Sequence, residues 1–239
     1  FRNYWASSGA TSLLPKFVDD MEMKMEYFDH CFIEGDTLET SDVVNGGAEL
    51  FLYQSGYLTI KGYDDGVYIL GFPNFEVRKA LYRVVVPALT MKSNSEVVSA
   101  QSFLRKMMQD GNTAEAKKAL KALIADVPYS NKKMASMDME ERYRLIMSTI
   151  FRALGFRVEV ERMLATGRID MIVEVPSIIY VLELKLSNNG GISAAESQIK
   201  EKSYTKPFKA DKRKVIALAV ELDETGKGLI DWKEVDESL

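Results

Sequence analysis

Apolar residues in the second half of the chain recur with two different periods. Helical spacing predicts a helix over residues 138–154, with an apolar stripe at Tyr143, Met147, Ile150 and Leu154. Runs of alternating or continuous apolar residues predict four strands, over 157–161, 168–175, 178–186 and 214–222. A second helix is expected over 193–204, between the last two strands.

The first half predicts helices around one hairpin. Strand-like segments at 56–61 and 67–71 flank a turn at 63–66, and helices are expected over 48–54 and from Asn74 toward Val86. Residues 95–126 have helical spacing with a break at Gly111-Asn112, which indicates a helical hairpin. The polar segment 128–133 is typical of a linker.

These patterns predict an α/β (mixed α+β) protein with a mixed sheet and two domains, 1–128 and 129–239. In the first domain the order helix, strand, turn, strand, helix is typical of a winged-helix-like module. Such a module binds DNA or packs against a neighbouring domain. We favour packing, because no recognition helix rich in Arg and Lys precedes the hairpin.

Composition removes several classes of chemistry. The 239 residues are 46% hydrophobic and 28% charged, which is typical of a globular protein. The single histidine, His30, and single cysteine, Cys31, are too few for Cys/His zinc sites or HExxH hydrolases. The pair itself is expected to lie in a packed helix. With no disulfide and no run of 18 apolar residues, we expect a cytoplasmic protein that does not span a membrane.

The formal charge of −4 lies in the first half, because residues 129–239 hold 18 basic and 18 acidic residues. Seven of those basic residues lie between 200 and 214, against two acidic ones. This stripe favours phosphate binding about as well as it favours a solvated helix face. The residues that we expect to contact nucleic acid are Lys200, Lys202, Lys206 and Lys209.

Two acidic residues are expected to meet on neighbouring strands. If Pro176-Ser177 is a two-residue connection, Val175 pairs with Ile178, and the same register places Asp170 opposite Glu183. A three-residue loop would instead place the carboxylates on opposite faces. Like charges that oppose each other repel, so the pair indicates a bound cation.

A hard divalent cation suits this pair. Mg²⁺ or Mn²⁺ would be held by Asp170, Glu183 and the carbonyl of Leu184, and Lys185 points to the same side. The lysine could then stabilise charge in the transition state of phosphodiester hydrolysis. The alternative is an exposed strand face on which Lys185 forms a structural salt bridge.

The segments Gly167-Arg168-Ile169-Asp170 and Glu183-Leu184-Lys185 resemble the PD-(D/E)XK nuclease superfamily. The surrounding elements agree with its restriction-endonuclease-like α-β-β-β-α-β core. The resemblance implies metal binding by Asp170 and Glu183, catalysis by Lys185, and supporting roles for Gln198 and Tyr204. It also implies an acidic residue in the first helix, Glu140 or Glu141, of which we prefer Glu140.

More closely, the chain resembles the nuclease-like domain at the C-terminus of bacterial AAA-ATPase-like proteins, many from Bacteroidetes-type genomes. Segments 1–5, 54–60 and 71–77 are similar to the end of that family's ATPase-like region, which implies an upstream ATPase-like partner domain. The chain itself contains no P-loop motif, so no ATP site is expected within it.

The sequence therefore leaves three functions open. The first is a Mg²⁺-dependent nuclease acting on DNA, as a module of a larger protein. The second is a nuclease-fold domain that binds nucleic acid or a protein without cutting. The third is a purely structural module that helps to assemble the parent protein.

Overall fold

The structure is a computed structural model that describes residues 27–40, 46–90, 92–125 and 137–236. The expected linker at 128–133 and the segment 1–5 lie outside the described residues. Contacts divide the chain into two compact units, residues 1–88 and 89–239. No helix in the described ranges is long and apolar enough to cross a membrane.

The first unit contains a three-stranded antiparallel sheet in the order β1-β3-β2. Its elements are the 3₁₀ turn η3 (Tyr27–Asp29), β1 (Cys31–Glu34), α2 (Gly35–Leu38), α3 (Gly47–Gln54), β2 (Thr59–Asp64), β3 (Val67–Gly71) and α4 (Phe75–Thr90). The predicted hairpin is present. Asp65 and Gly66 form its two-residue turn, and both have the positive φ angles that such a tight connection requires.

The expectation that His30-Cys31 lies in a helix is wrong. Cys31 begins β1 and pairs with Leu70 of β3. The four residues of β1 alternate between buried and exposed, which is the period of a strand with one covered face. Cys31 is one of the buried residues, and burial is the largest cause that raises its pKa, to about 12.

The second unit has four helices of eight residues or more in its described part beyond α4. They are α5 (Asn94–Asp110), α6 (Thr113–Ile124), α8 (Met139–Ala153) and α9 (Gly191–Lys202). The predicted helical hairpin is confirmed, because Gly111 ends α5 in a left-handed conformation and the Asn112 side chain caps α6. The predicted stripe of α8 is buried along its length.

The five strands of this unit form one mixed sheet in the order β4-β5-β6-β7-β8. They are β4 (Arg157–Leu164), β5 (Gly167–Glu174), β6 (Ile178–Leu186), β7 (Lys214–Leu222) and β8 (Leu229–Val235). Only the β6–β7 pair is parallel. The predicted mixed α/β fold is confirmed, but β8 was not predicted, and β4 is three residues longer than expected.

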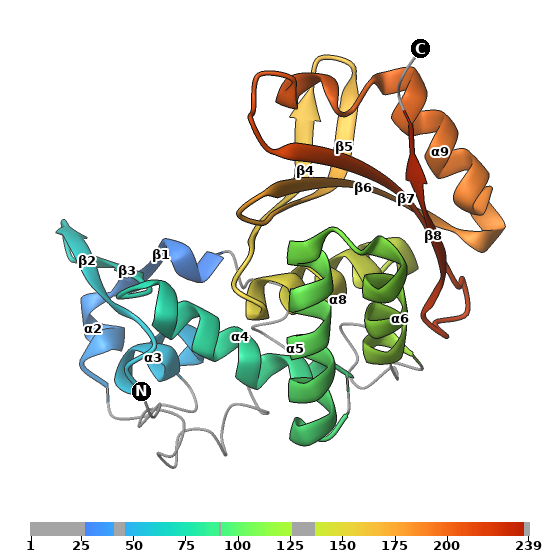
Figure 1. Ribbon diagram of the computed structural model, residues 1–239. Coiled ribbons are helices and arrows are strands. Elements are labelled where there is room, and N and C mark those ends of the chain that lie inside the picture. The colour runs from blue at the N-terminus through green and yellow to red at the C-terminus, as the bar shows by residue number, and fades with distance from the viewer. Residues whose placement is uncertain (1–26, 41–45, 91, 126–136, 237–239) are drawn as a thin grey trace. The chain divides into compact units, whose positions relative to one another are not determined.

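Helices cover both faces of this sheet. Figure 1 shows α9 against one face and α5, α6 and α8 against the other. Ala195 and Ile199 of α9 pack on Val181 and Ala219 in one buried apolar cluster. On the other face, the buried Tyr180 hydroxyl donates a 2.6 Å hydrogen bond to the carbonyl of Met108 in α5. The helical hairpin thus packs with the C-terminal sheet.

The division into compact units differs from the predicted domain boundary. Residues 89–125 pack with the second unit, although they were expected to belong to the first domain. Side-chain contacts account for this, since Trp232 of β8 donates to the carbonyl of Thr113, and Lys117 forms an ion pair with Asp231. A start of the nuclease-like domain itself at residue 129 stays a prediction.

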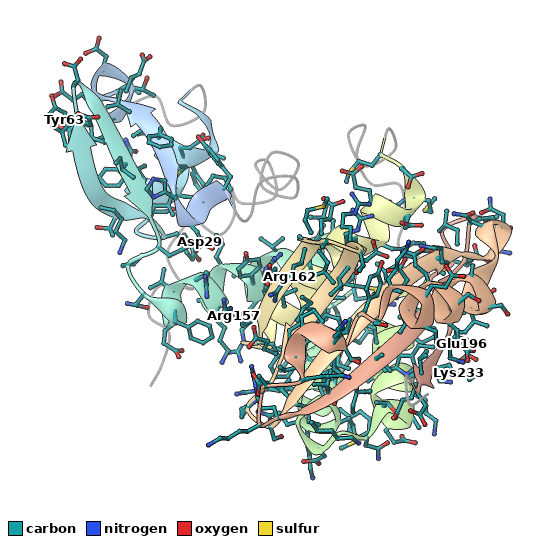
Figure 2. The ribbon with its side chains drawn as sticks, turned by 90° about the horizontal axis from the view of Figure 1, so that it is seen from above. Asp29, Tyr63, Arg157, Arg162, Glu196 and Lys233 are labelled. Carbon is teal, nitrogen blue, oxygen red and sulfur yellow. The ribbon has the colours of Figure 1, made fainter. Side chains whose placement is uncertain are left out.

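Tyr180→Phe is expected to destabilise the second unit by about 1 kcal/mol, because it removes the buried 2.6 Å hydrogen bond and leaves the Met108 carbonyl with only the 3.4 Å bond from the Gly111 amide. Urea denaturation of the whole chain would measure the loss. Tyr63→Phe is the matched control, since the Tyr63 side chain is exposed (Figure 2), and it should leave the unfolding free energy unchanged. Equal effects of the two substitutions would contradict the packing of α5 on this sheet.

Candidate metal-dependent active site

The β5–β6 register agrees with the prediction. The Val175 amide donates to the Ile178 carbonyl across the Pro176-Ser177 connection, at 2.9 Å. From there the ladder runs through Glu174–Ile179 to Met171–Leu182. The next residues along this register are Asp170 and Glu183, where the described ladder stops. The two-residue connection is confirmed, and the acidic residues lie where the strands part.

Asp170 and Glu183 are both buried, at 3% and 0% exposure. One Asp170 oxygen, Oδ2, accepts a 2.9 Å hydrogen bond from the amide of Leu184. Glu183 Oε2 is buried without a hydrogen-bond partner among the described residues. Burial, and then the neighbouring Asp170 charge, raise the pKa of Glu183 well above its ordinary value. A buried carboxylate in this position indicates a place for a cation.

Lys185 is the positive charge nearest to this pair in the described structure. Its Nζ lies 2.5 Å from Glu183 Oε1 and 3.2 Å from the Leu184 carbonyl oxygen. Burial by itself lowers the pKa of Lys185, but its hydrogen bond to Glu183 and the nearby Asp170 and Glu140 outweigh burial and raise it. Lys185 is therefore an ammonium at neutral pH, suited to stabilising negative charge rather than to accepting a proton.

Helix α8 adds a third carboxylate. The Asp138 side chain caps this helix by accepting from the Glu140 amide, which fixes the first turn beside the sheet. Glu140 is partly buried. Burial and then Asp170 raise its pKa, while Lys185 and Arg144 lower it, so Glu140 lies within electrostatic reach of the pair. Glu141 is exposed, and the preferred residue is therefore the one that reaches the site.

Gln198 and Tyr204 lie together on the other side of the site. The backbone of Ser203 is left-handed, with φ of 50°, and turns the chain after α9 so that Tyr204 is fully buried. The Tyr204 hydroxyl accepts from Gln198 Nε2 at 2.9 Å and donates to the Arg168 carbonyl at 2.7 Å. This pair therefore holds the strand two residues before Asp170.

The four predicted nucleic-acid-binding lysines do not form one group. Lys200 forms a 2.7 Å ion pair with Glu196, which also binds Lys233 (Figure 2). Lys202 is partly buried, and Lys206 and Lys209 are exposed. Lys206 and Lys209 line a pocket of about 690 Å³ near the start of β7. The parallel β6–β7 register places the pocket's lining residues of β7, 214–217, beside residues 178–181, which precede Glu183 in β6.

A second charged group beside the site was not predicted. Glu161 of β4 binds Arg144 of α8 and Arg168 of β5 through the same oxygen, Oε1, at 2.6 and 2.7 Å. Arg144 also lies 3.5 Å from Glu140. No spacing in the sequence predicts that Glu161 binds arginines from a helix and from a second strand. The one sequence signal is that Arg168 lies two residues before Asp170.

These residues fit a hard divalent cation. Among the described residues, no group of three or more His, Cys, Asp or Glu side chains is arranged to hold a metal. Asp170 and Glu183 nevertheless supply two buried carboxylates, one with an unpartnered oxygen, and the Leu184 carbonyl oxygen lies 3.2 Å from Lys185 Nζ. Oxygen donors of this kind are the ligands that Mg²⁺ and Mn²⁺ prefer.

Comparison with known proteins agrees with this geometry. Residues 138–232 match the family described as "PD-(D/E)XK nuclease superfamily". The match supports a nuclease-like module over this part of the chain, and proteins of that superfamily usually use divalent metals such as Mg²⁺ or Mn²⁺. The matched residues contain α8, α9 and the strands β4 to β7, together with β8 except for its last three residues.

One similar curated protein is the "uncharacterized protein in vnfD 5'region" of Azotobacter chroococcum mcd 1. It is 25% identical over 253 residues, and the match covers all of this chain. The chain spans 47% of the length of that relative. No solved structure matches the chain.

The raised pKa of Glu183 predicts how stability depends on pH without metal. Above the ordinary value of 4.5 the unfolded chain loses a proton that folded Glu183 still holds, so stability falls as pH rises through this window. Glu183→Gln has no such proton. The decrease in the free energy of unfolding between about pH 5 and about pH 8 should therefore be smaller in Glu183→Gln than in the wild type, by about 1 kcal/mol or more.

Urea denaturation in EDTA at the two pH values would measure this difference. Asp231→Asn is a suitable control, because its ion pair with Lys117 lowers the pKa of Asp231 and places its titration below this window. The control should keep the full fall of the wild type. An identical fall in Glu183→Gln would contradict the raised pKa.

Proposed function

We propose that this domain is a divalent-metal-dependent nuclease that hydrolyses phosphodiester bonds, with DNA as its substrate. The observation that carries the proposal is the pair of buried carboxylates where β5 and β6 part, one oxygen of which has no partner in the described structure. Such a pair is costly unless a cation joins it. The match to the superfamily supports a nuclease-like module.

Each residue has a role that its surroundings support. Asp170, Glu183 and the Leu184 carbonyl hold Mg²⁺ or Mn²⁺, and a bound ion supplies Lewis-acid stabilisation and lowers the pKa of water. Lys185, charged at neutral pH, stabilises negative charge on the phosphate and orients the attacking water. Glu140, Gln198 and Tyr204 keep these groups in place.

Asp170→Asn and Glu183→Gln are each expected to lower cleavage of labelled DNA in Mg²⁺ by at least about 100-fold, because each removes a metal-binding charge. Asp231→Asn, an acidic residue of the edge strand β8, should retain full activity. Thermal unfolding of all three variants checks that they fold. Full activity in either Asp170→Asn or Glu183→Gln would contradict the assignment.

One contact favours a second candidate, a nuclease-fold module that binds without cutting. Lys185 Nζ touches both Glu183 and the Leu184 carbonyl oxygen, two of the three groups assigned to the metal. In a silent domain the ammonium would take the cation's place permanently. In an active enzyme Asp170, Glu183 and the Leu184 carbonyl would hold the metal, and the Lys185 ammonium would face the substrate phosphate.

Calorimetric titration of Mn²⁺ separates these candidates. For the nuclease we expect wild type to bind Mn²⁺ and Asp170→Ala to lose binding, since the variant removes a ligand. For the silent module, wild type would not bind, and Lys185→Gln, which removes the internal cation, would gain binding. The second pattern would contradict the nuclease proposal.

Nucleic-acid binding is proposed to involve the exposed lysines after α9. In an Asp170→Asn background, replacing both Lys206 and Lys209 with Gln should lower the salt dependence of DNA binding by about two phosphate contacts. Fluorescence anisotropy across a range of KCl concentrations measures it. Lys200→Gln should have a smaller effect, because Glu196 already binds that ammonium. Lys233→Gln is the control. An equal change in the salt dependence of DNA binding for this variant would contradict the proposal.

We also propose that the parent protein contains an ATPase-like region upstream of this chain. The proposal rests on the resemblance of segments within 1–128 to the end of such a region. The winged-helix-like interpretation of the first unit stays a prediction. Its element order α3, β2, β3, α4 is compatible with that interpretation, and β1 adds a third strand to the sheet.

A further inference from the structure

The backbone of β4 changes course at Glu161, next to the candidate active site. Glu161 has a left-handed backbone with φ of 54°, which is uncommon for a residue other than glycine. In the β4–β5 ladder, the pairs Val160–Met171 and Arg162–Ile169 flank Glu161 and Asp170, which are not themselves paired in the described ladder. The irregularity therefore falls at the register position opposite Asp170. Irregular strand backbone of this kind often re-aims a side chain beside an active site.

The Glu161 side chain joins two arginines from different elements. Its Oε1 lies 2.6 Å from Nη1 of Arg144 and 2.7 Å from Nη1 of Arg168. Arg144, with 11% of its side chain exposed, continues to Glu140, whose carboxylate is in electrostatic contact with Asp170. A continuous line of charges thus runs from the carboxylates of the site through Arg144 and Glu161 to Arg168.

Arg168 is the exposed end of this line. Its side chain is 47% exposed. The ion pair with Glu161 uses one terminal nitrogen, and among the described contacts the other N–H donors of the guanidinium stay available. Both ends of the residue are held, because Tyr204 binds its backbone carbonyl and Glu161 binds its head group. A half-exposed guanidinium held in this way is suited to bind a phosphate.

The charge of a bound phosphodiester favours such a group. Glu140, Asp170 and Glu183 carry three carboxyl groups, which Lys185, Arg144 and a divalent cation would offset. The negative charge of the phosphodiester itself then calls for a further cation. Arg168 lies two residues from Asp170 on β5 and supplies a fixed cation at the exposed side.

We infer that Arg168 binds a non-bridging phosphate oxygen of the nucleic acid beside the metal-binding carboxylates, and that Glu161 and Arg144 position it. This inference rests on the proposed function and extends it to substrate binding. Arg168 contacts the substrate. Glu161 and Arg144 act through Arg168 and are positioning residues.

Steady-state cleavage of a labelled DNA duplex in Mg²⁺ provides the first test. Arg168→Gln should raise KM by about tenfold with a smaller change in kcat, as expected for one lost charge-assisted hydrogen bond. Arg168→Lys, which keeps the charge without the planar fork, should recover part of the loss. Glu161→Gln should raise KM in the same direction, and less than Arg168→Gln.

Arg157→Gln is the matched control. Arg157 lies on the same strand as Glu161, four residues earlier, and its 78% exposed side chain pairs with Glu174 at 3.6 Å (Figure 2). It should leave KM and kcat unchanged. An equal rise in KM for Arg157→Gln and Arg168→Gln would overturn the inference, because the effect would then come from general positive charge.

Equilibrium binding gives a measurement that does not depend on cleavage. In an Asp170→Asn background, adding Arg168→Gln should lower the slope of log K against log salt by about one phosphate contact, whereas adding Arg157→Gln should not. Wild type that cleaves DNA while Arg168→Gln changes neither KM nor this slope would overturn the inference and leave the proposed function intact. Wild type that neither cleaves nor binds DNA would overturn both.

Discussion

The structure of the second unit depends on holding two like-charged carboxylates side by side in its interior. Asp170 and Glu183 face each other where the β5–β6 ladder ends, and both are almost completely removed from water. Desolvation and mutual repulsion both oppose ionisation there, and the pKa of Glu183 is raised as a result. The surrounding elements supply the Leu184 amide and the Lys185 ammonium as local compensation.

The rest of the fold maintains this arrangement. The apolar stripe of α8 packs on the sheet and brings Glu140 to one side of the pair, while α9 and the turn at Ser203 bring Gln198 and Tyr204 to the other. Strands β6 and β7 are parallel and buried over most of their length, so the positions of Glu183 and Lys185 are fixed by a rigid element.

Local sequence information was sufficient wherever one short-range rule determined the structure. The strand β6 has the limits predicted for it, because a continuous apolar run between turn residues has few other solutions. The β5–β6 register followed from the two-residue connection. A shift by one residue would move every side chain of the strand to the other face of the sheet, so the connection length fixes the pairing. Where the pattern was weaker, prediction failed. His30-Cys31 was expected in a helix, and the apolar residues of the edge strand β8, Leu229, Ile230, Trp232 and Val235, do not alternate with polar ones at the period of a strand.

The sequence by itself determined that the domain has a mixed sheet, and that Asp170, Glu183 and Lys185 lie on adjacent strands, because period and connection length act over a few residues. Only the tertiary structure decided that α5 and α6 pack with the C-terminal sheet, that Lys185 contacts the proposed metal ligands, and that Glu161 joins Arg144 to Arg168. Those contacts join residues that are far apart in the chain or lie at an irregular backbone position. They depend on how whole elements pack, which no local periodicity specifies.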